Sequence, residues 1–577
     1  MPYPGSVSSI ARLGDAHEGG HLPGAAGRRQ AVHALLRGQD RKRSTGGGDF
    51  SGASLLLVSG RILTMDAGDT VAEALAVQGE HIAAVGTDQQ VLELASSGTE
   101  VVDLRGRTVV PGFIDAHAHV ELGMFAEHFW LDLRDIPLEL AKDRIAERVS
   151  VQPPGTWILG QGTLGQELPS RDELDTLAPR HPVALRLSMH RLIANTQALS
   201  LSGIRRGFPA SPTGSWIHRD ALAEPTGVIS EGFDLLAWES PSVSQLAEPL
   251  RETLIDQFLS QGVTTVYEIP ASAAAVRAYQ HLKGAGRLPV RLRLFPTAAP
   301  GHQPLAAVET FAHLGIESGF GDDWLAFGGS KIFVDGWSEG AWSSEVALMA
   351  PATQGFLTRT LQRLIEETTL AFSSGVQVWL HAGGDVAQRM AVTAIEEGRT
   401  GVPDADHRAR IEHIFNQGID ESLLDRVLEA GALAVPNPTF MFFESEERPS
   451  DVGPRYPIRS LQAKGLRPPG SSDSAGSQPW AINPWFGIKC MVARENCHSA
   501  TIDLDEAIGV ADALRAYTID AAHAGFEEGT KGSLEVGKLA DLVVLAEDPF
   551  TIPASNLDEV GTDLVIIGGA VASGATR

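Results

Sequence analysis

Residues 109–119 read VVPGFIDAHAH: an apolar strand, a Pro-Gly turn, and a second apolar strand that ends in two histidines. Side chains at positions i and i+2 of a strand point to the same face, so His117 and His119 direct both imidazoles to one point and could chelate one metal ion. The alternative is a pair of structural histidines, because the His-x-His spacing is common. In a (β/α)₈ barrel, catalytic groups lie at the C-terminal ends of the strands, which is where these histidines stand.

Composition narrows the class of protein. The chain has 577 residues, too many for one compact core, so we expect two or three domains. A formal net charge of −26 argues against nucleic acid or an anionic membrane as a partner. The two cysteines, Cys490 and Cys497, do not make a disulfide framework and are compatible with a reducing compartment. No apolar run reaches the roughly 18 residues that span a bilayer, and we expect a cytoplasmic protein.

The pattern along the chain predicts its domains. Residues 1–50 are rich in Gly, Ser and Arg without a sustained apolar period, which is typical of a disordered leader. Short apolar runs split by glycine turns occupy 51–110 and 526–577, which predicts one discontinuous β domain. Between them, at 111–525, strands alternate with helical patterns, as in parallel βα units of an α/β fold. Eight candidate strands fit a (β/α)₈ TIM barrel: 112–117, 263–268, 291–295, 326–334, 376–381, 410–413, 432–435 and a short strand before Asp473.

The connection between the first two candidate strands is far longer than an ordinary βα loop. It holds its own strand-like and helix-like segments, such as TWILGQG and LPSRDELDTLAP. We therefore expect an inserted subdomain at about 121–255, placed over the mouth of the barrel.

Several of these segments resemble one family. VVPGFIDAHAH is similar to the first barrel strand of the amidohydrolase superfamily. GSLEVGKLADLVVL, at 532–545, is similar to the C-terminal segment of its members. SMHRLIANTQAL and TGVISEG favour the YtcJ-like branch, amidohydrolase family 3, which includes enzymes of the N-substituted formamide deformylase type. The resemblance covers about residues 54–570. It implies a barrel with an insertion after the first strand and a small β-sandwich built from both termini.

Lys331 lies inside the apolar segment LAFGGSKIFVDG, where a charged and unpaired lysine would be costly. An ammonium group cannot ligate a metal, but carboxylation by CO₂ would give an anionic carbamate with two oxygens that bridges two cations. The resemblance places the carboxylated lysine of binuclear amidohydrolases here. The alternative is a structural or substrate-facing lysine, paired with Asp335.

Three further residues complete the candidate metal ligands. His381 lies in HAGGD and His413 in RIEH, contexts that resemble the ligand motifs of the family. Asp473 resembles the aspartate after the eighth strand, and its alternative is a loop or helix-cap residue. Imidazole suits zinc and other divalent transition metals. The expected metal ligands are His117, His119, Lys331, His381, His413 and Asp473.

The resemblance implies a binuclear centre and a hydrolytic mechanism. We expect two divalent ions bridged by carboxylated Lys331 and a hydroxide, and Zn²⁺ is the first candidate for their identity. The expected division of the other ligands is His117, His119 and Asp473 for one ion, and His381 and His413 for the second. The hydroxide would attack the carbonyl carbon of an amide, such as an N-acyl or N-formyl amine. Asp473 would be catalytic, as general base and then general acid, and the products would be an amine and a carboxylic acid.

Polar and aromatic residues near the predicted barrel mouth are candidates for contact with a small-molecule amide substrate. His190 and Asn195 stand in SMHRLIANTQAL, and Glu231 ends TGVISE. Trp337 and Trp342 follow the segment of Lys331, where a loop would face the site, although packing is an equal alternative for both tryptophans.

Two other functions stay open at this point. One is a mononuclear deaminase or decarboxylase with an unmodified Lys331, although a single-metal site has no need of a bridging ligand. The other is a catalytically inactive binding protein that keeps the fold, although six candidate ligands in order argue against it. A homodimer is possible with any of these functions.

Overall fold

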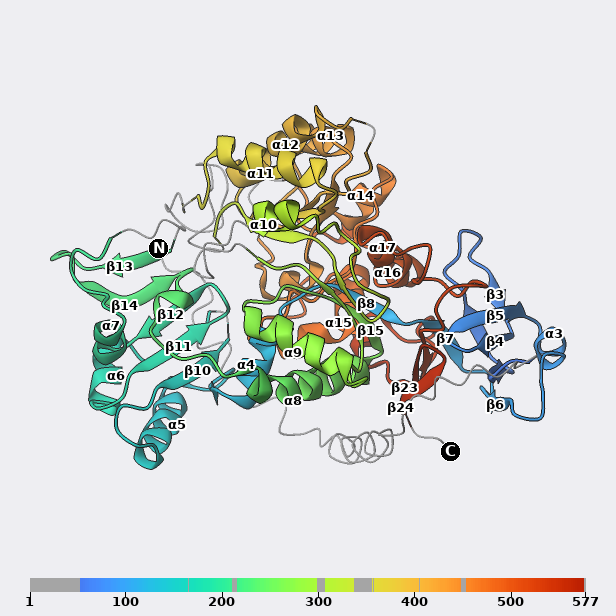
Figure 1. Ribbon diagram of the computed structural model, residues 1–577, viewed down its shortest axis with the longest axis horizontal. Coiled ribbons are helices and arrows are strands. Elements are labelled where there is room, and N and C mark those ends of the chain that lie inside the picture. The colour runs from blue at the N-terminus through green and yellow to red at the C-terminus, as the bar shows by residue number, and fades with distance from the viewer. Residues whose placement is uncertain are drawn as a thin grey trace.

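The computed structural model describes residues 52–163, 165–209, 215–297, 307–336, 355, 357–403, 405–447 and 453–574. The predicted leader at 1–50 lies outside these residues. The described chain is an α/β protein with a central unit of strands and helices, a sheet-and-helix region on one side and a β-rich unit on the other (Figure 1).

Two four-stranded parallel sheets form the central unit. The first has the order β17-β16-β15-β8 and the second the order β18-β19-β20-β21. A parallel bridge between Thr297 and Lys331 connects them. Their strands are β8 (Phe113–Ala118), β15 (Val263–Glu268), β16 (Arg291–Leu294), β17 (Leu325–Phe327), β18 (Ser330–Phe333), β19 (Val378–His381), β20 (Arg410–Glu412) and β21 (Leu433–Val435).

Helices connect the parallel strands of the central unit. They include α9 (Ala273–Gly284), α10 (Ala307–Leu314), α11 (Leu361–Ser373), α12 (Asp385–Arg399) and α13 (Glu421–Glu429). A connection through a helix is how a chain returns to start the next parallel strand. None of the helices in the described residues is long and apolar enough to cross a bilayer.

Burial on both faces explains the composition of the central strands. All six residues of β8 and of β15 are buried, and β15 begins with Val, Thr, Thr and Val, which favour strands. Side chains from both sheets meet in one interior cluster that includes Ile114, Tyr267 and Trp379. The ring of Trp379 stacks on Phe295 with 3.5 Å between centroids. The two sheets therefore share an interior.

Two of the predicted central strands are wrong in detail. The strand expected at 326–334 is broken at Gly328 and Gly329 into β17 and β18, which belong to different sheets. A Cβ at Gly328 would lie 2.3 Å from the ring of Phe295, so this close approach requires glycine. The strand expected before Asp473 is absent: residues 466–474 are irregular, and Asp473 itself has a φ of +47°. Residues 470–474 still hydrogen-bond to β8 through backbone groups.

A six-stranded sheet with its own helices fills most of the predicted insertion. It occupies 131–230, with the order β13-β14-β12-β11-β10-β9, and lies on the left in Figure 1. Its elements are β9 (Leu131–Asp132), α5 (Leu138–Val151), β10 (Ile158–Gly162), α6 (Arg171–Leu177), β11 (Val183–Leu187), β12 (Arg191–Ala194), α7 (Thr196–Leu201), β13 (Trp216–Arg219) and β14 (Pro225–Ser230). The flanking helices α4 (Val120–His128) and α8 (Val243–Thr253) instead pack in the cluster that contains Phe113 and Val263 of the central strands.

The β-rich unit, which we call the terminal unit, joins both ends of the described chain (Figure 1). Its sheets have the orders β5-β4-β1-β6 and β24-β23-β22-β7-β2-β3, and one hydrophobic cluster contains side chains from both. Strand β7 pairs in parallel with β2 and antiparallel with β22. The strands are β1 (Leu55–Val58), β2 (Arg61–Leu63), β3 (Val71–Ala72), β4 (Ala74–Gln78), β5 (His81–Gly86), β6 (Glu100–Asp103), β7 (Thr108–Pro111), β22 (Leu542–Leu545), β23 (Thr562–Ile567) and β24 (Ala570–Gly574).

A buried ion pair ties the terminal unit to the central sheets. Arg291, the first residue of β16, donates from Nε to Asp541 at 2.6 Å and from Nη2 at 2.9 Å. Asp541 directly precedes β22 and also accepts a hydrogen bond from the backbone of Gly568 at 2.8 Å. The aspartate of the GSLEVGKLADLVVL segment thus binds an arginine of the central sheets.

Two buried glutamates fix the helix that follows His119. Glu268, at the end of β15, accepts hydrogen bonds from the backbone amides of Val120 (2.6 Å) and Glu121 (3.2 Å), the first residues of α4. Glu121 in turn accepts from the amide and the hydroxyl of Ser272, which precedes α9. Each carboxylate caps the start of a helix in the neighbouring segment. Burial raises the pKa of Glu268 to about 8, against the effect of its backbone hydrogen bonds.

We expect Glu268→Gln to change how stability depends on pH. A folded-state pKa near 8, above that of the unfolded chain, gives stability that is complete below the unfolded pKa and is lost as pH rises through about 8. The free energy of unfolding of the wild type minus that of the variant should fall by more than about 1 kcal/mol between pH 6 and pH 9. Urea unfolding at both pH values measures this difference. A difference that is the same at both would contradict the raised pKa.

Candidate metal centre

His117, His119 and Asp473 converge on one point. His117 is near the end of β8, and His119 immediately precedes α4; both are buried. Asp473 is held beside them because its backbone amide donates to the carbonyl of His117 at 2.8 Å. Its Oδ1 lies 3.3 Å from Nε2 of His117 and 3.3 Å from Nε2 of His119. One donor atom from each of the three residues lies within 4.8 Å of the other two.

Lys331 lies directly beside this cluster. It is in β18, is buried, and its Nζ is 2.9 Å from Nε2 of His117. Burial lowers the pKa of Lys331 to about 8. Asp335, the partner considered in the alternative, accepts hydrogen bonds from the backbone amides of Gly383 and Gly384 at 2.9 and 2.8 Å.

His381 and His413 lie next to this cluster. His381 ends β19, and His413 follows β20 with a φ of +69°, which turns its side chain out of the strand direction. Their ring centroids are 4.5 Å apart. Nε2 of His413 lies 3.8 Å from Oδ2 of Asp473. The structure therefore brings all six predicted ligands into one connected group.

The protonation states of this group suit a divalent metal. Burial lowers the pKa of His119 to about 4 and that of His413 to about 3, so both imidazoles are neutral at physiological pH. Burial opposes ionisation of Asp473, but the neighbouring imidazoles of His117 and His119 hold its pKa well below the usual range. Neutral imidazoles and an ionised carboxylate are the forms that bind metal ions. The donor set of His117, His119 and Asp473 thus fits a divalent ion.

Two of the residues predicted to contact substrate lie near the centre. His190 follows β11, and its Nδ1 lies 2.6 Å from a carboxylate oxygen of Glu231, directly after β14. The ring centroids of His190 and His381 are 5.9 Å apart, so this pair from the inserted sheet lies near the candidate ligands. Trp337 and Trp342 lie outside the described residues.

The expectation for Asn195 is wrong. Its Oδ1 accepts from the backbone amides of Val183 (3.0 Å) and Ala198 (2.9 Å), and its Nδ2 donates to the carbonyl of His181 at 2.9 Å. The side chain is buried at the N-cap of α7. Asn195 is therefore a structural cap of a helix.

Comparison with known proteins identifies the family. Residues 100–572 match the model of the amidohydrolase family. This chain belongs to the amidohydrolase family. It is 30% identical to the N-substituted formamide deformylase of Arthrobacter pascens over 533 residues, which cover 88% of this chain and 96% of that relative. It is 29% identical to the putative amidohydrolase YtcJ of Bacillus subtilis (strain 168) over 550 residues, 89% and 98% of the two chains. The resemblance to the YtcJ-like branch is confirmed.

A solved structure supports the same assignment. An uncharacterized metal-dependent hydrolase from Pyrococcus horikoshii superposes on this amidohydrolase with a TM-score of 0.68 and 25% sequence identity. The match covers 87% of this chain and 99% of that one. Family and relatives together support a metal-dependent hydrolase.

Sequence reasoning missed two carboxylates that support the candidate ligands. Asp115 accepts from the hydroxyl of Ser472 at 2.6 Å and from its amide at 3.0 Å, which ties β8 to the segment of Asp473. Glu412 lies 2.6 Å from Nδ1 of His117. Both are carboxylates in short strands, FIDAHA and RIE, whose residues are all buried, and a charged residue within a short predicted strand was the available signal.

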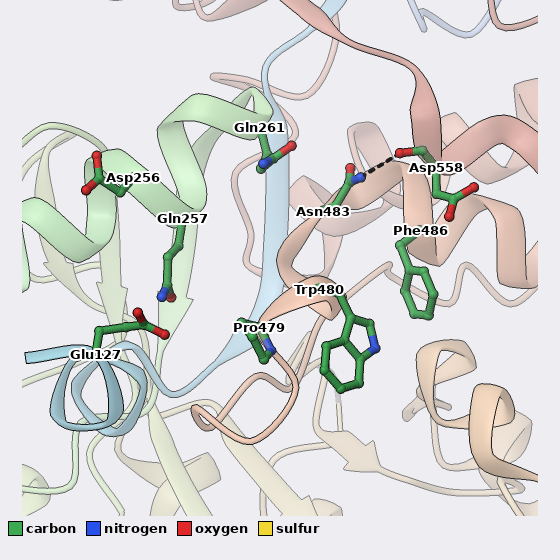
Figure 2. Close-up of a pocket in the computed structure, with 9 residues that line it drawn as sticks. All are labelled: Glu127, Asp256, Gln257, Gln261, Pro479, Trp480, Asn483, Phe486 and Asp558. Atoms are coloured by element: carbon green, nitrogen blue, oxygen red, sulfur yellow. Dashed lines mark hydrogen bonds between the residues drawn. The ribbon is translucent and has the colours of Figure 1, made fainter. Parts of the chain in front are cut away.

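A cavity apart from the candidate ligands lies beside α4 and has a volume of about 450 Å³ (Figure 2). Glu127, Asp256 and Asp558 give it a negative charge, and Trp480 and Phe486 are aromatic walls. Two of these carboxylates are neutralised by basic residues: Glu127 pairs with Arg134 at 2.8 Å and Asp558 with Lys489 at 3.0 Å. None of the candidate ligands lines this cavity.

Proposed function

We propose that this amidohydrolase cleaves the C–N bond of an amide-type substrate, an N-acyl or N-formyl amine. The observation that carries the proposal is the convergence of His117, His119 and Asp473 on one point beside Lys331. The similarity to an N-substituted formamide deformylase, over most of both chains, favours a formyl or other small acyl group.

We propose that the central strands close into a (β/α)₈ barrel and that the terminal unit is a β-sandwich. The shared interior of the two parallel sheets supports the barrel, as do the backbone hydrogen bonds from β8 to residues 470–474. The common hydrophobic cluster of the two terminal sheets supports the sandwich. In this architecture, His117, His381 and His413 stand at or just after the C-terminal ends of barrel strands.

The centre would hold two divalent ions, with Zn²⁺ the first candidate for these ligands. His117, His119 and Asp473 would bind one ion, and His381 and His413 the other. A carbamate on Lys331 would bridge them. Because the pKa of Lys331 is lowered to about 8, a substantial share of the buried amine is neutral at physiological pH, which is the form that reacts with CO₂.

Bound metal ions would lower the pKa of a water molecule and polarise the scissile carbonyl group. Asp473 then accepts a proton from the attacking water as its oxygen bonds to the carbonyl carbon. The same carboxyl group donates that proton to the amide nitrogen as the C–N bond breaks. The products are a carboxylic acid, formic acid for a formyl substrate, and an amine.

The pair from the inserted sheet would orient the substrate. Glu231 accepts a hydrogen bond from Nδ1 of His190, which fixes the plane of the imidazole. We propose that the imidazole of His190 contacts a polar group of the substrate.

The test counts divalent metal ions per chain in purified protein by elemental analysis. We expect about two ions per chain, with fewer in His117→Ala and in Lys331→Ala. Lys489→Ala, which removes the ion-pair partner of Asp558, is the control and should keep the wild-type content. A screen of N-formyl and N-acyl amines for released amine then gives the activity.

Other outcomes would change the assignment. One ion per chain that survives Lys331→Ala would contradict the bridging carbamate and favour a mononuclear deaminase or decarboxylase. No metal, even after reconstitution with zinc and bicarbonate, would contradict the enzyme proposal and leave a binding protein.

A further inference from the structure

His117, Glu412 and Arg410 form a chain of buried, hydrogen-bonded side chains. Nδ1 of His117 lies 2.6 Å from Oε2 of Glu412. Arg410, two residues earlier in β20, donates from Nε to Oε1 of Glu412 at 2.7 Å and from Nη2 to Oε2 at 3.0 Å. The side chains of all three residues are 0% exposed. The guanidinium carbon of Arg410 also lies 3.6 Å from the centre of the Trp379 ring.

This arrangement determines which ring nitrogen of His117 carries hydrogen. Both oxygens of Glu412 accept N–H hydrogen bonds from the guanidinium group of Arg410, which is always charged, so this carboxylate acts only as an acceptor. Nδ1 of His117 must therefore donate. Its Nε2 is left with a lone pair, and this nitrogen is the one that faces Nζ of Lys331 at 2.9 Å and Oδ1 of Asp473 at 3.3 Å.

The pair of Arg410 and Glu412 is poorly explained by stability alone. Burial of two charges carries a desolvation cost that their attraction often does not repay, and apolar residues of similar size are commonly as stable. Nη1 of Arg410 is buried without a hydrogen-bond partner among the described residues, which adds to the cost. A role in positioning the imidazole of His117 would explain why this buried ion pair is present.

We propose that Glu412, held by Arg410, is a positioning residue that fixes His117 with hydrogen on Nδ1 and so strengthens the binding of a divalent ion at Nε2. The inference rests on the proposed function, because it assumes that His117 is a ligand. A hydrogen-bonded carboxylate behind a ligating imidazole fixes its tautomer and raises its basicity. The pair thus acts through His117 and contacts neither substrate nor metal.

The test compares Zn²⁺ affinity of metal-free wild type and Glu412→Gln, by competition with a chelator of known affinity. Glutamine keeps the size of the side chain but removes the charge, and its amide can donate to Nδ1 and reverse the tautomer. We expect binding that is weaker by about 10–100-fold. The matched control is Asp541→Asn, another buried carboxylate held by two bonds from an arginine, which should leave Zn²⁺ affinity unchanged.

A second measurement reads the tautomer without metal. The ¹⁵N chemical shifts of the His117 ring, assigned with His117→Gln, should show hydrogen on Nδ1 in the metal-free wild type and its loss in Glu412→Gln. Hydrogen on Nε2 in the wild type would overturn the inference. A Glu412→Gln protein that binds Zn²⁺ as tightly as the wild type would also overturn it. So would a loss of Zn²⁺ affinity in Glu412→Gln that is no larger than the loss in Asp541→Asn. A wild type with the expected tautomer that binds no Zn²⁺ would overturn the proposed function and, with it, the role in affinity.

Discussion

Asp473→Asn should lower kcat/KM for amide hydrolysis by about 10²–10⁴-fold. Asparagine has nearly the same shape and tolerates the φ of +47° at this position, so the backbone bond to His117 is kept. It cannot take a proton from water and return it to the leaving nitrogen. Steady-state kinetics on an N-formyl amine, with metal content measured on the same samples, gives the result.

The control for this substitution is Asp256→Asn, at the cavity of Figure 2 and away from the ligands. It should hydrolyse the substrate like the wild type. If Asp473→Asn retains wild-type kcat/KM at full metal content, Asp473 is not the proton carrier.

Loss of the buried carboxylate at Asp541 should lower the free energy of unfolding by about 3–5 kcal/mol in Asp541→Ala. The substitution leaves the guanidinium of Arg291 buried without the carboxylate that now binds it at 2.6 and 2.9 Å. Urea unfolding monitored by tryptophan fluorescence measures the change. The double variant Arg291→Met/Asp541→Leu should recover most of the loss, because it removes both charges.

A surface pair in the same unit provides the comparison. Arg61 and Asp548 are bonded at 3.0 Å but are both more than a third exposed. Asp548→Ala should cost about 0–1 kcal/mol. An Asp541→Ala protein that is no less stable than Asp548→Ala would show that the buried pair does not hold the terminal unit to the central sheets.

Much of the fold was predictable because local pattern decides it. Strands β8, β15 and β19 are buried apolar runs, and the sequence places them within a few residues of their true bounds. The break at Gly328 was not predictable, because it depends on how near Phe295 comes from another strand. The irregular path of the chain before Asp473 was likewise not predictable, because it depends on backbone hydrogen bonds with the distant strand β8.

The candidate site shows the same division. Each predicted ligand stands in a short motif or at the end of an apolar strand, and the structure brings them together, while their role as ligands stays a prediction. The link from His117 to Glu412 joins residues far apart in the chain, so no local pattern reveals it. Asn195 shows the opposite case, because a residue in a family-like motif is used to cap a helix.

The meeting of β7 and β22 in one sheet has a consequence for biosynthesis. The whole central unit separates these strands in the chain, so β7 leaves the ribosome long before its partner exists. At about 5–20 residues per second, the wait is on the order of a minute. During that time one edge of β7 and the apolar faces of the first strands are exposed to proteases and to other nascent chains. We therefore expect chaperones to bind mainly the N-terminal strands during translation and to dissociate once the finished chain is released.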